Sequence, residues 1–548
     1  MLLATADSVT AADSRCFSDD FLFGSATASY QVEGAVKEGG RTRSIWDQFC
    51  RERPGVKCAN VADDFYHRYK DDVQLMVKMG LQSFRFSISW SRVMNWDPAL
   101  HGMRPNPEGV AFYHSLIDEL KANNIKPILT LYHWDLPLEL HTELLPQGWL
   151  NSDIVQHYAE FAALIFHEYG SKVNLWTTFN EPLSFTTAGY ATGREAPGFT
   201  GSPTQVYTAT HNVLLSHARA VQLFRELKNS HVINDKARVA IVLNADYAYP
   251  LDESNPADVE AASRKMEFDV GWFLSPIVSG DYPSVMRDIV GDRLPRFTPE
   301  ETALLKGSYD LFMLNHYSTR AATDCDSSAS KTDCNKLAIG WQRDRGVDIS
   351  QTALKDSHCA SFTAYPPGYL ETIKWLHKHD TSADILLTEN GWCGDDEIET
   401  PINYVHKAIT EEHIPIIGYT AWSFLDNYEG VVRVALRSVL RQLHVESGSP
   451  DFYEPKPGSG AYSSSVGQVV PESGDVQVSE CGRSFRNYSH DARECRSQSP
   501  RVALAVRHRG VAVVGFVVVV VLVFFVGRRI WRHFRGHDGA TNEGTPLL

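Results

Sequence analysis

Eight apolar, strand-like runs alternate along this chain with amphipathic stretches, and this alternation constrains the fold more than any other feature. The runs cover residues 21–30, 83–90, 126–134, 174–181, 238–247, 310–318, 384–391 and 415–424. Most are continuously apolar, which is typical of parallel strands that are covered on both faces. Between them, apolar residues recur at helical spacing in 63–79, 109–122, 152–169 and 209–228.

Eight strand–helix units over about 450 residues predict an α/β fold, a single (β/α)8 TIM barrel with long loops. We place this barrel at residues 19–470. An open, doubly wound parallel sheet is the alternative. We disfavour it because no glycine-rich nucleotide-binding loop follows the first run.

Polar and aromatic residues gather where the runs end, which in a (β/α)8 barrel is the edge that carries the active site. Two of them are acids that stand beside amides, Asn180-Glu181 in TFNEP and Glu389-Asn390 in TENG. Arg85 lies within the second run. The other candidates are Gln31, His133, Trp134, Asn315, Tyr317, Trp422 and Glu429.

Taken singly, each candidate has an ordinary structural role, as an ion-pair partner, a core histidine or a packing tryptophan. Together they are typical of a carbohydrate site, because indoles stack on a sugar ring while acids, amides and hydroxyls bind its hydroxyl groups. Two carboxyl groups can hydrolyse a glycosidic bond when one is protonated and the other is ionised. Arg85 is the cation placed to keep one of them ionised. This chemistry calls for no metal and no organic cofactor.

Seven motifs occur in order along the chain: SYQVEGA, RFSISWSR, HWDLP, TFNEP, NHYS, TENG and WSFLDNYE. In this order they resemble family 1 glycoside hydrolases, the β-glucosidase and lactase family, over roughly the whole of the predicted barrel. The resemblance implies a retaining β-glycosidase that acts on β-glucosyl, β-galactosyl or related substrates. Glu181 would be the general acid/base and Glu389 the nucleophile.

The same resemblance implies roles for the other candidates. Asn180 would bind the sugar 2-hydroxyl, while Tyr317 and Arg85 would orient and tune Glu389. The remaining glycone hydroxyls and further substrate contacts would fall to Gln31, His133, Trp134, Asn315, Trp422 and Glu429. An acid at position 429 favours an unphosphorylated sugar. The chain departs from the family directly afterwards, at Gly430 and in residues 437–445, so one rim of the glycone pocket is altered.

A second functional class is a catalytically silent, Klotho-like barrel that serves as a receptor partner or lectin. Such members usually lose one of the two acids, and this chain keeps both. The altered stretch after Glu429 is the feature that favours the silent class.

The net charge indicates which ligands the protein can bind, and the cysteine spacing indicates whether it resides in an oxidising compartment. The chain has 52 basic and 67 acidic residues, a net charge of −15, which argues against a nucleic-acid surface and suits a neutral or cationic ligand. Three cysteine pairs are close in sequence, Cys50/Cys58, Cys325/Cys334 and Cys481/Cys495. Local pairs in polar loops favour disulfides and an oxidising compartment. Unpaired thiols are the alternative.

The last part of the chain predicts a membrane anchor. Residues 471–509 are polar and are expected to form a stalk. Residues 510–527 are uncharged and rich in valine, and as a helix they would extend roughly 27 Å, enough to span a bilayer. Arginines in the tail, residues 528–548, favour a cytoplasmic C-terminus. A buried core strand is the alternative for the apolar run.

The N-terminal segment, residues 1–18, lacks the basic and apolar regions of a signal peptide. A glycosylation sequon at Asn487 lies upstream of the apolar run, which agrees with that side being luminal. We therefore expect a single-pass type I membrane protein with its barrel extracellular or luminal, at the plasma membrane or in endo-lysosomal compartments. This anchor makes the chain most similar to the membrane-attached, lactase-like members of the family.

Overall fold

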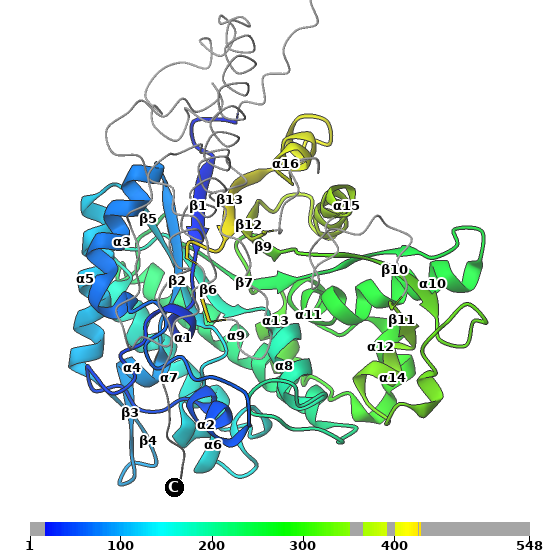
Figure 1. The fold of residues 1–548 in the computed structure, drawn as a ribbon, viewed down its shortest axis with the longest axis horizontal. Coiled ribbons are helices and arrows are strands. Elements are labelled where there is room, and N and C mark those ends of the chain that lie inside the picture. The colour runs from blue at the N-terminus through cyan, green and yellow to red at the C-terminus, as the bar shows by residue number, and fades with distance from the viewer. Residues whose placement is uncertain (1–16, 351–364, 392–400, 426, 429–548) are drawn as a thin grey trace, which may run out of the picture. The chain divides into compact units, whose positions relative to one another are not determined.

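The eight predicted runs form one closed barrel of parallel strands (Figure 1). The structure is a computed structural model that describes residues 17–350, 365–391, 401–425 and 427–428. Around the barrel the strands follow the order β1 (Leu22–Ala26), β13 (Ile416–Trp422), β12 (Ile385–Glu389), β9 (Phe312–Asn315), β7 (Arg238–Asn244), β6 (Leu175–Asn180), β5 (Lys126–Tyr132) and β2 (Ser83–Ser87). Because β1 pairs with both β13 and β2, the barrel closes, and the open doubly wound sheet is excluded.

The strand period of two decides which side chains face into the barrel. On β2, Phe84 and Phe86 pack into the large core between the strands and the surrounding helices. Arg85 stands between them and therefore points to the opposite, inner side, where it is fully buried. A smaller apolar cluster inside the barrel supports this polar layer, and it consists of Leu22, Ile128, Leu175, Ala240, Val242, Leu311, Met313 and Leu386.

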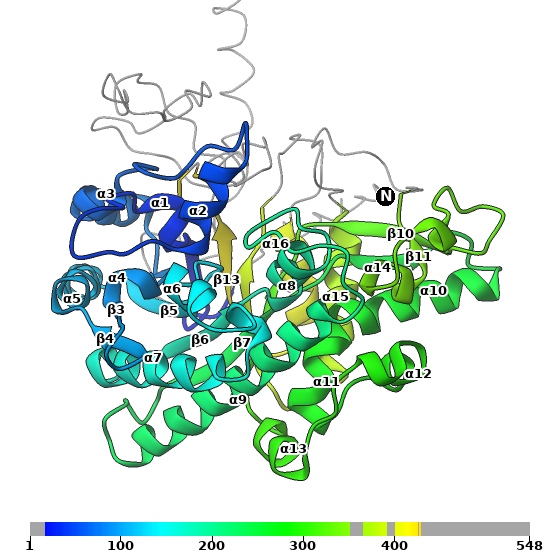
Figure 2. The ribbon, with the colours of Figure 1, turned by 90° about the horizontal axis from the view of Figure 1, so that it is seen from below.

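The predicted amphipathic stretches form the long helices around the barrel (Figure 2). They are α3 (Phe65–Met79), α5 (Pro107–Ala122), α7 (Ile154–Tyr169) and α9 (Gln205–Asn229). In α5, proline occupies the first turn, where no backbone donor is needed, and Tyr113, Leu116 and Leu120 are buried on one face. Two further helices, α15 (Pro366–His377) and α16 (Pro401–Thr410), complete the described part of the ring.

A second sheet, which the sequence analysis did not predict, lies outside the barrel. Its strands are β11 (Val347–Asp348), β10 (Thr319–Asp324) and β8 (Tyr247–Pro250), in that order. It packs with α10 (Pro256–Met266), and α14 (Trp341–Arg345) directly precedes β11 (Figure 1). We call residues 246–350, without β9, the outer sheet module.

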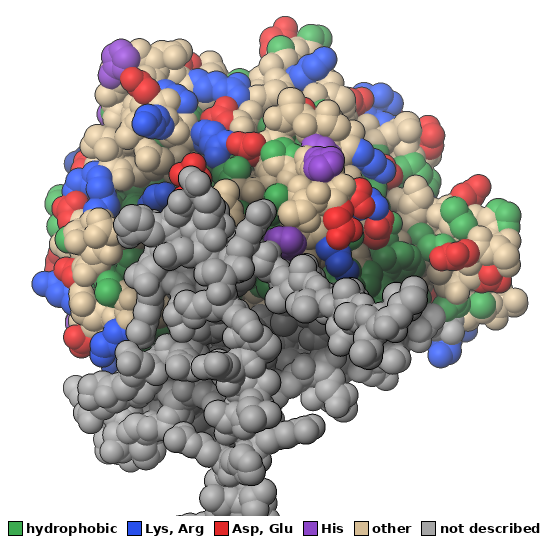
Figure 3. All heavy atoms as spheres, turned by 90° about the horizontal axis from the view of Figure 1, so that it is seen from above, with side chains coloured by type: hydrophobic (Ala, Val, Ile, Leu, Met, Phe, Trp, Pro, Cys, Tyr) green, Lys and Arg blue, Asp and Glu red, His purple; other side chains and the backbone are tan. Residues whose placement is uncertain are grey.

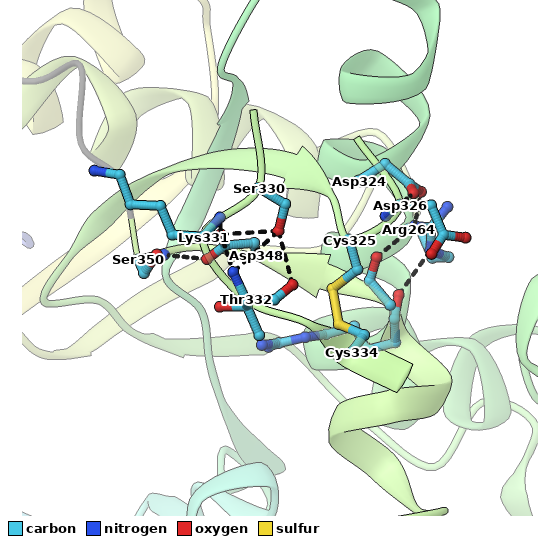
Figure 4. Close-up of a disulfide and its surroundings, with 12 residues drawn as sticks. Arg264, Asp324, Cys325, Asp326, Ser330, Lys331, Thr332, Cys334, Asp348 and Ser350 are labelled. Atoms are coloured by element: carbon cyan, nitrogen blue, oxygen red, sulfur yellow. Dashed lines mark hydrogen bonds and ion pairs between the residues drawn. A yellow bond between two sulfur atoms is a disulfide. The ribbon is translucent and has the colours of Figure 1, made fainter. Parts of the chain in front are cut away.

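A disulfide between Cys325 and Cys334 closes a loop of the outer sheet module, as Figure 4 shows. Within this loop, Ser330 Oγ and the backbone amides of Lys331 and Thr332 donate hydrogen bonds to one carboxylate oxygen of Asp348. Burial opposes the ionisation of Asp348, but hydrogen bonds from Ser350, and then those from Lys331 and Thr332, hold its pKa below the usual value. The loop is thus fastened to β11, the strand that follows α14.

The remaining described elements are short. They are α1 (Ser29–Val32), α2 (Ile45–Glu52), α4 (Trp90–Val93), β3 (Met94–Asp97), β4 (Gly102–Pro105), α6 (Leu138–Thr142), η1 (Gly148–Leu150), α8 (Pro182–Tyr190), η2 (Glu267–Gly271), α11 (Trp272–Ser279), α12 (Ser284–Val290), η3 (Gly291–Arg293), α13 (Pro299–Leu305) and η4 (Cys334–Lys336). Charged side chains of both signs intermingle on the face shown in Figure 3.

Two of the three predicted disulfides are formed, Cys50–Cys58 and Cys325–Cys334. The third predicted pair, Cys481/Cys495, lies outside the described residues, as do Glu429 and Gly430. The stalk, the apolar run 510–527 and the tail lie outside them as well. Over the parts of the chain that are described, no helix combines the length and the apolarity that crossing a membrane requires.

Candidate active site

The two acids stand at the ends of two barrel strands. Glu389 is the last residue of β12, and Glu181 follows β6 and caps the N-terminus of α8. Both side chains are buried, with 3% and 8% of the residue exposed. Glu181 has a φ of 47°, a left-handed conformation that non-glycine residues rarely adopt. Such strain persists where the surrounding structure enforces it, which is common at functional sites.

Glu389 is held by a cation and a phenol. Arg85 Nη1 donates a hydrogen bond to Glu389 Oε1, and the Tyr317 hydroxyl donates to Oε2 at 2.8 Å. Burial raises the pKa of Glu389, and the positive charge of Arg85, together with these hydrogen bonds, opposes that effect. The buried guanidinium thus favours an ionised Glu389.

Glu181 has neutral partners instead. Asn315 Nδ2 donates to Glu181 Oε1 at 2.7 Å, and Ser184 Oγ donates to Oε2 at 2.8 Å. Burial, reinforced by the negative charge of Glu389, raises the pKa of Glu181 to about 8. At neutral pH one acid of the pair is therefore protonated while its neighbour is paired with a cation.

A single amide links the two acids. Asn315, at the end of β9, bonds Glu181 Oε1, and its amide also contributes to lowering the pKa of Glu389. The same Nδ2 donates to Asn180 Oδ1, which accepts a hydrogen bond from Arg85, the partner of Glu389. The two acids therefore belong to one hydrogen-bonded network.

Asn180 is fixed at the centre of the site. Its Oδ1 accepts hydrogen bonds from Arg85 Nη2 at 2.7 Å and from Asn315 Nδ2 at 3.1 Å. Its Nδ2 consequently faces His133 Nε2, at 3.2 Å, and donates to it. Burial, and then the charge of Arg85, lower the pKa of His133 well below its usual value. His133 is therefore a neutral imidazole with its proton on Nδ1.

The aromatic candidates surround this network. Trp134 Nε1 donates to the backbone carbonyl of Asn180 at 2.9 Å. The Trp422 ring stacks on His133 with a centroid distance of 5.7 Å, and Tyr317 packs against the same cluster as Trp422. Gln31 lies beside the last described segment, since its Nε2 donates to Asn427 Oδ1 at 3.0 Å and to the carbonyl of Tyr428 at 2.8 Å.

Hydrogen bonds and ring contacts thus join the predicted residues 85, 133, 134, 180, 181, 315, 317, 389 and 422. Sequence reasoning missed two supporting hydroxyls. Thr388 Oγ1 donates to Asn315 Oδ1 at 2.7 Å, and Ser184 bonds Glu181. Ser184 occupies the third helical position after the capping Glu181, and this spacing could have revealed it. In the described chain, no three His, Cys, Asp or Glu residues are grouped to hold a metal ion.

A cavity of about 420 Å³ opens beside Glu181. Glu181, Asn315 and Tyr317 form one side of it. The outer sheet module forms much of the rest, through Asp246, Lys265, Asp269, Arg320, Trp341, Gln342, Arg345 and Ile349. This places the cavity next to Glu181, the acid whose pKa is raised to about 8, where a leaving group would be protonated.

Replacing Ser184 with Ala is expected to move the alkaline limb of the pH–activity profile to higher pH. The Ser184 hydroxyl bonds the ionised form of Glu181 and lowers its pKa. Without that bond the protonated acid persists above pH 8, so kcat/KM should hold to higher pH before it falls. The measurement is kcat/KM against pH for an aryl β-glucoside.

Thr187→Val is the matched control, because Thr187 also lines the cavity but bonds the helix backbone. An unchanged alkaline limb in Ser184→Ala would contradict the assignment.

Known proteins share the sequence pattern and the fold of the barrel. The sequence model of glycosyl hydrolase family 1 matches residues 13–450. Furcatin hydrolase of Viburnum furcatum is 40% identical over 460 residues, which cover 78% of this chain and 81% of the relative. Beta-glucosidase 1B of Phanerodontia chrysosporium is 38% identical over 445 residues, which cover 75% of this chain and 78% of the relative.

Solved structures agree with the sequence relatives. A rice beta-glucosidase superposes with a TM-score of 0.68 at 33% identity, covering 76% of this chain and 91% of the rice chain. The beta-glucosidase from Trichoderma harzianum gives a TM-score of 0.68 at 35% identity, covering 76% of this chain and 90% of that structure. With its closed barrel, its two buried acids and these relatives, the chain belongs to glycosyl hydrolase family 1 and is a glycosidase.

Proposed function

We propose that this protein is a retaining β-glycosidase that hydrolyses terminal β-D-glucosyl or β-D-galactosyl bonds, with Glu181 as general acid/base and Glu389 as nucleophile. One observation carries the proposal. Glu389 is paired with Arg85, whereas Glu181 is bonded to a neutral amide and a hydroxyl and has its pKa raised to about 8. The two environments separate the acids into an attacking carboxylate and a proton donor.

In the first step, Glu389 attacks the anomeric carbon while Glu181 gives its proton to the glycosidic oxygen. The bond between that carbon and the oxygen breaks, the aglycone leaves as an alcohol, and the sugar is esterified to Glu389. Esterification removes the negative charge of Glu389, which is one of the causes of the raised pKa of Glu181. The pKa of Glu181 therefore falls after this step, and Glu181 stays ionised.

In the second step, the ionised Glu181 takes a proton from a water molecule as that water attacks the anomeric carbon. The ester bond breaks, Glu389 leaves as a carboxylate beside Arg85, and the sugar is released in the β configuration. Glu181 is protonated again, so both groups return to their starting states. Tyr317 and Arg85 hold the Glu389 carboxylate in line for attack.

The glycone contacts belong to the same proposal. Asn180 binds the sugar 2-hydroxyl. Its amide lies between His133 and Arg85, and Arg85 in turn is the partner of the nucleophile. His133 presents its Nδ1 proton, which has no partner among the described residues, as a donor to a sugar hydroxyl. The rest of the glycone is held by Gln31, Trp134, Asn315, Trp422 and Glu429.

Turnover of aryl β-glycosides tests the proposal. We expect the protein to release 4-nitrophenol from the β-glucoside, the β-galactoside or both, and to release the sugar first as its β-anomer. The assay compares both substrates and follows the first-formed anomer by proton NMR. A wild-type protein that hydrolyses none of the β-glycosides would favour the silent, receptor-like class. Release of the α-anomer would overturn the retaining mechanism.

We propose that a C-terminal helix, residues 510–527, anchors the protein as a type I membrane protein with its barrel extracellular or luminal, at the plasma membrane or in endo-lysosomal compartments. The uncharged run of that length and the arginines after it support the anchor. The two local disulfides support an oxidising compartment. The anchor also supports likeness to the lactase-like members, although the relatives described above are plant and fungal enzymes.

Extraction of membranes at alkaline pH tests the anchor. The full chain should stay in the membrane pellet, and a variant that ends at residue 509 should be released. Treatment with a glycosidase that removes N-linked glycans should shift the mass of the full chain through Asn487. Recovery of the full chain in the soluble fraction would contradict the anchor.

A further inference from the structure

The cavity beside Glu181 has a charged wall that the hydrolytic mechanism does not use. Its residues come from the outer sheet module: Asp246 lies before β8, Lys265 is in α10, Asp269 is in η2, Arg320 is in β10 and Arg345 is in α14. Asp246 follows the barrel strand β7 by two residues, and the other four come from the helices and strands of the outer sheet module.

The centre of this wall is a buried group of three charges. Lys265 Nζ donates to Asp269 Oδ2 at 2.7 Å, and Arg345 Nη1 donates to Asp269 Oδ1 at 3.2 Å. The three residues are only 1%, 5% and 8% exposed, in the order Lys265, Asp269, Arg345. Burial opposes the ionisation of Asp269, yet the two cations hold its pKa below the usual value. One carboxylate therefore balances two buried cations.

The adjacent pair does not supply the missing negative charge. Arg320 Nε donates to Asp246 Oδ2 at 3.2 Å, so the charge of Asp246 is matched by Arg320. Across the five residues, three cations face two carboxylates. An uncompensated charge in a buried site is costly unless a counter-ion completes it, and Glu181, protonated near neutral pH, is not that counter-ion.

Two hydrogen-bond donors of the same wall lack acceptors. Arg345 Nε and Trp341 Nε1 have no partner among the described residues, and both side chains line the cavity. The Arg345 guanidinium carbon lies 4.6 Å from the centre of the Trp341 ring, so the two donors belong to one stacked unit. Neither group can accept a hydrogen bond, so each needs an acceptor atom, which an oxygen of a bound ligand would supply.

We infer that this wall is a specificity site for a leaving group that bears an oxyanion, such as a carboxylate, which Arg345 binds beside Trp341. The inference rests on the proposed function and extends it from the sugar to the aglycone. Arginine binds carboxylates through parallel hydrogen bonds, and the stacked indole gives an aromatic aglycone an apolar surface. The disulfide-closed loop is fastened to Asp348 of β11 (Figure 4). Arg345 ends α14, the helix that directly precedes this strand.

A matched pair of substrates tests this inference, 4-carboxyphenyl and 4-carbamoylphenyl β-D-glucoside. They differ in charge but hardly in shape. We expect the ratio of their kcat/KM values, carboxylate over amide, to fall about tenfold or more in Arg345→Gln, because a charge-assisted hydrogen bond is lost. Comparing ratios between proteins cancels the intrinsic reactivity of the two leaving groups. Arg343→Gln is the control, since Arg343 is an exposed arginine of the same helix, and its ratio should equal that of the wild type.

Two further measurements distinguish an absent anionic subsite from a variant that does not fold and from a protein that does not hydrolyse β-glucosides. Trp341→Phe removes one donor but keeps an aromatic ring, and we expect its ratio to fall in the same direction. This variant keeps the inference testable even where Arg345→Gln does not fold. Binding of the unreactive 4-carboxyphenyl and 4-carbamoylphenyl 1-thio-β-D-glucosides, measured by calorimetry, does not depend on turnover. Tighter binding of the carboxylate by a protein that fails to hydrolyse any β-glucoside would reject the proposed function but keep the anionic subsite.

Equal ratios in the wild type, Arg345→Gln and Trp341→Phe, with no preference for the carboxylate in binding, would overturn the inference. A loss of activity in Arg345→Gln that is the same for both substrates would also overturn it. That result would mean that the three buried charges only support the wall of the cavity. Hydrolysis of 4-nitrophenyl β-D-glucoside by each variant shows that Glu181 and Glu389 remain functional in these comparisons.

Discussion

Replacing Glu389 with Ala lowers kcat on aryl β-glucosides by about 10⁴-fold or more, the order of loss seen when a covalent nucleophile is removed. The buried carboxylate beside Arg85 is the group placed to attack, and no step of the proposed reaction proceeds without it. Added azide should restore part of the activity by attacking from the vacated side, which yields the α-glucosyl azide. The measurement is release of 4-nitrophenol with and without azide, with the product identified by NMR.

Two variants control this experiment. Glu389→Gln keeps the volume of the side chain and should be as inactive as Glu389→Ala, which separates lost chemistry from lost packing. Glu143→Ala removes an exposed acid at the end of α6 and should leave kcat unchanged. Because removing the partner of a buried charge destabilises a fold, the thermal stability of each variant is measured as well. A folded Glu389→Ala protein that keeps kcat within tenfold of the wild type would contradict the nucleophile assignment.

Replacing Glu181 with Gln should lower kcat/KM by about 10²- to 10⁴-fold for aryl glucosides with poor leaving groups, the usual contribution of a general acid. For 2,4-dinitrophenyl β-D-glucoside the loss of kcat/KM should be much smaller, because that leaving group departs without a proton. The alkaline limb near pH 8 should disappear from the kcat/KM profile, since the group that carries it is gone. Azide should here give the β-glucosyl azide by attacking the glycosyl-enzyme.

The comparison across leaving groups is the decisive part of the Glu181 experiment. A structural lesion would reduce kcat/KM by the same factor for all leaving groups and would leave the shape of the pH profile unchanged. Ser184→Ala serves as the control, because it alters a partner of Glu181 but keeps the acid. An equal loss with phenyl and 2,4-dinitrophenyl substrates would contradict the role of Glu181 as proton donor.

The barrel could be predicted from the sequence because each strand is a separate apolar run. Every predicted run contains an observed strand, although the strands are shorter: the predicted 310–318 contains β9, which spans Phe312–Asn315. The outer sheet module could not be predicted in this way. Its strand β11 has two residues, and β10 pairs with β8 across about 70 residues of sequence, as in Thr319 with Tyr247. Short strands whose partners are distant leave no local pattern.

The catalytic part of the site was predictable for the same reason as the barrel. Glu181, Glu389 and Asn315 all follow or end apolar runs, and parallel strands bring these ends to one edge. The charged wall was not predictable, since Lys265, Asp269 and Arg345 come from helices of the outer sheet module, and only the fold brings them to the cavity. Trp134 was expected to contact the sugar, and its indole also bonds the Asn180 carbonyl, a contact that no spacing indicates.

The central claim is that Glu389 forms a covalent bond to the sugar, and trapping that bond tests it most directly. The wild-type protein is incubated with 2-deoxy-2-fluoro-β-D-glucosyl fluoride, in which the fluorine at carbon 2 slows the second step. Mass spectrometry of the intact protein and of its peptides then locates the label. We expect one 2-deoxy-2-fluoroglucosyl group per chain, on the peptide that carries Glu389, together with loss of activity. A label on any other residue, or steady turnover of β-glucosides by a protein that never takes up the label, would contradict the claim.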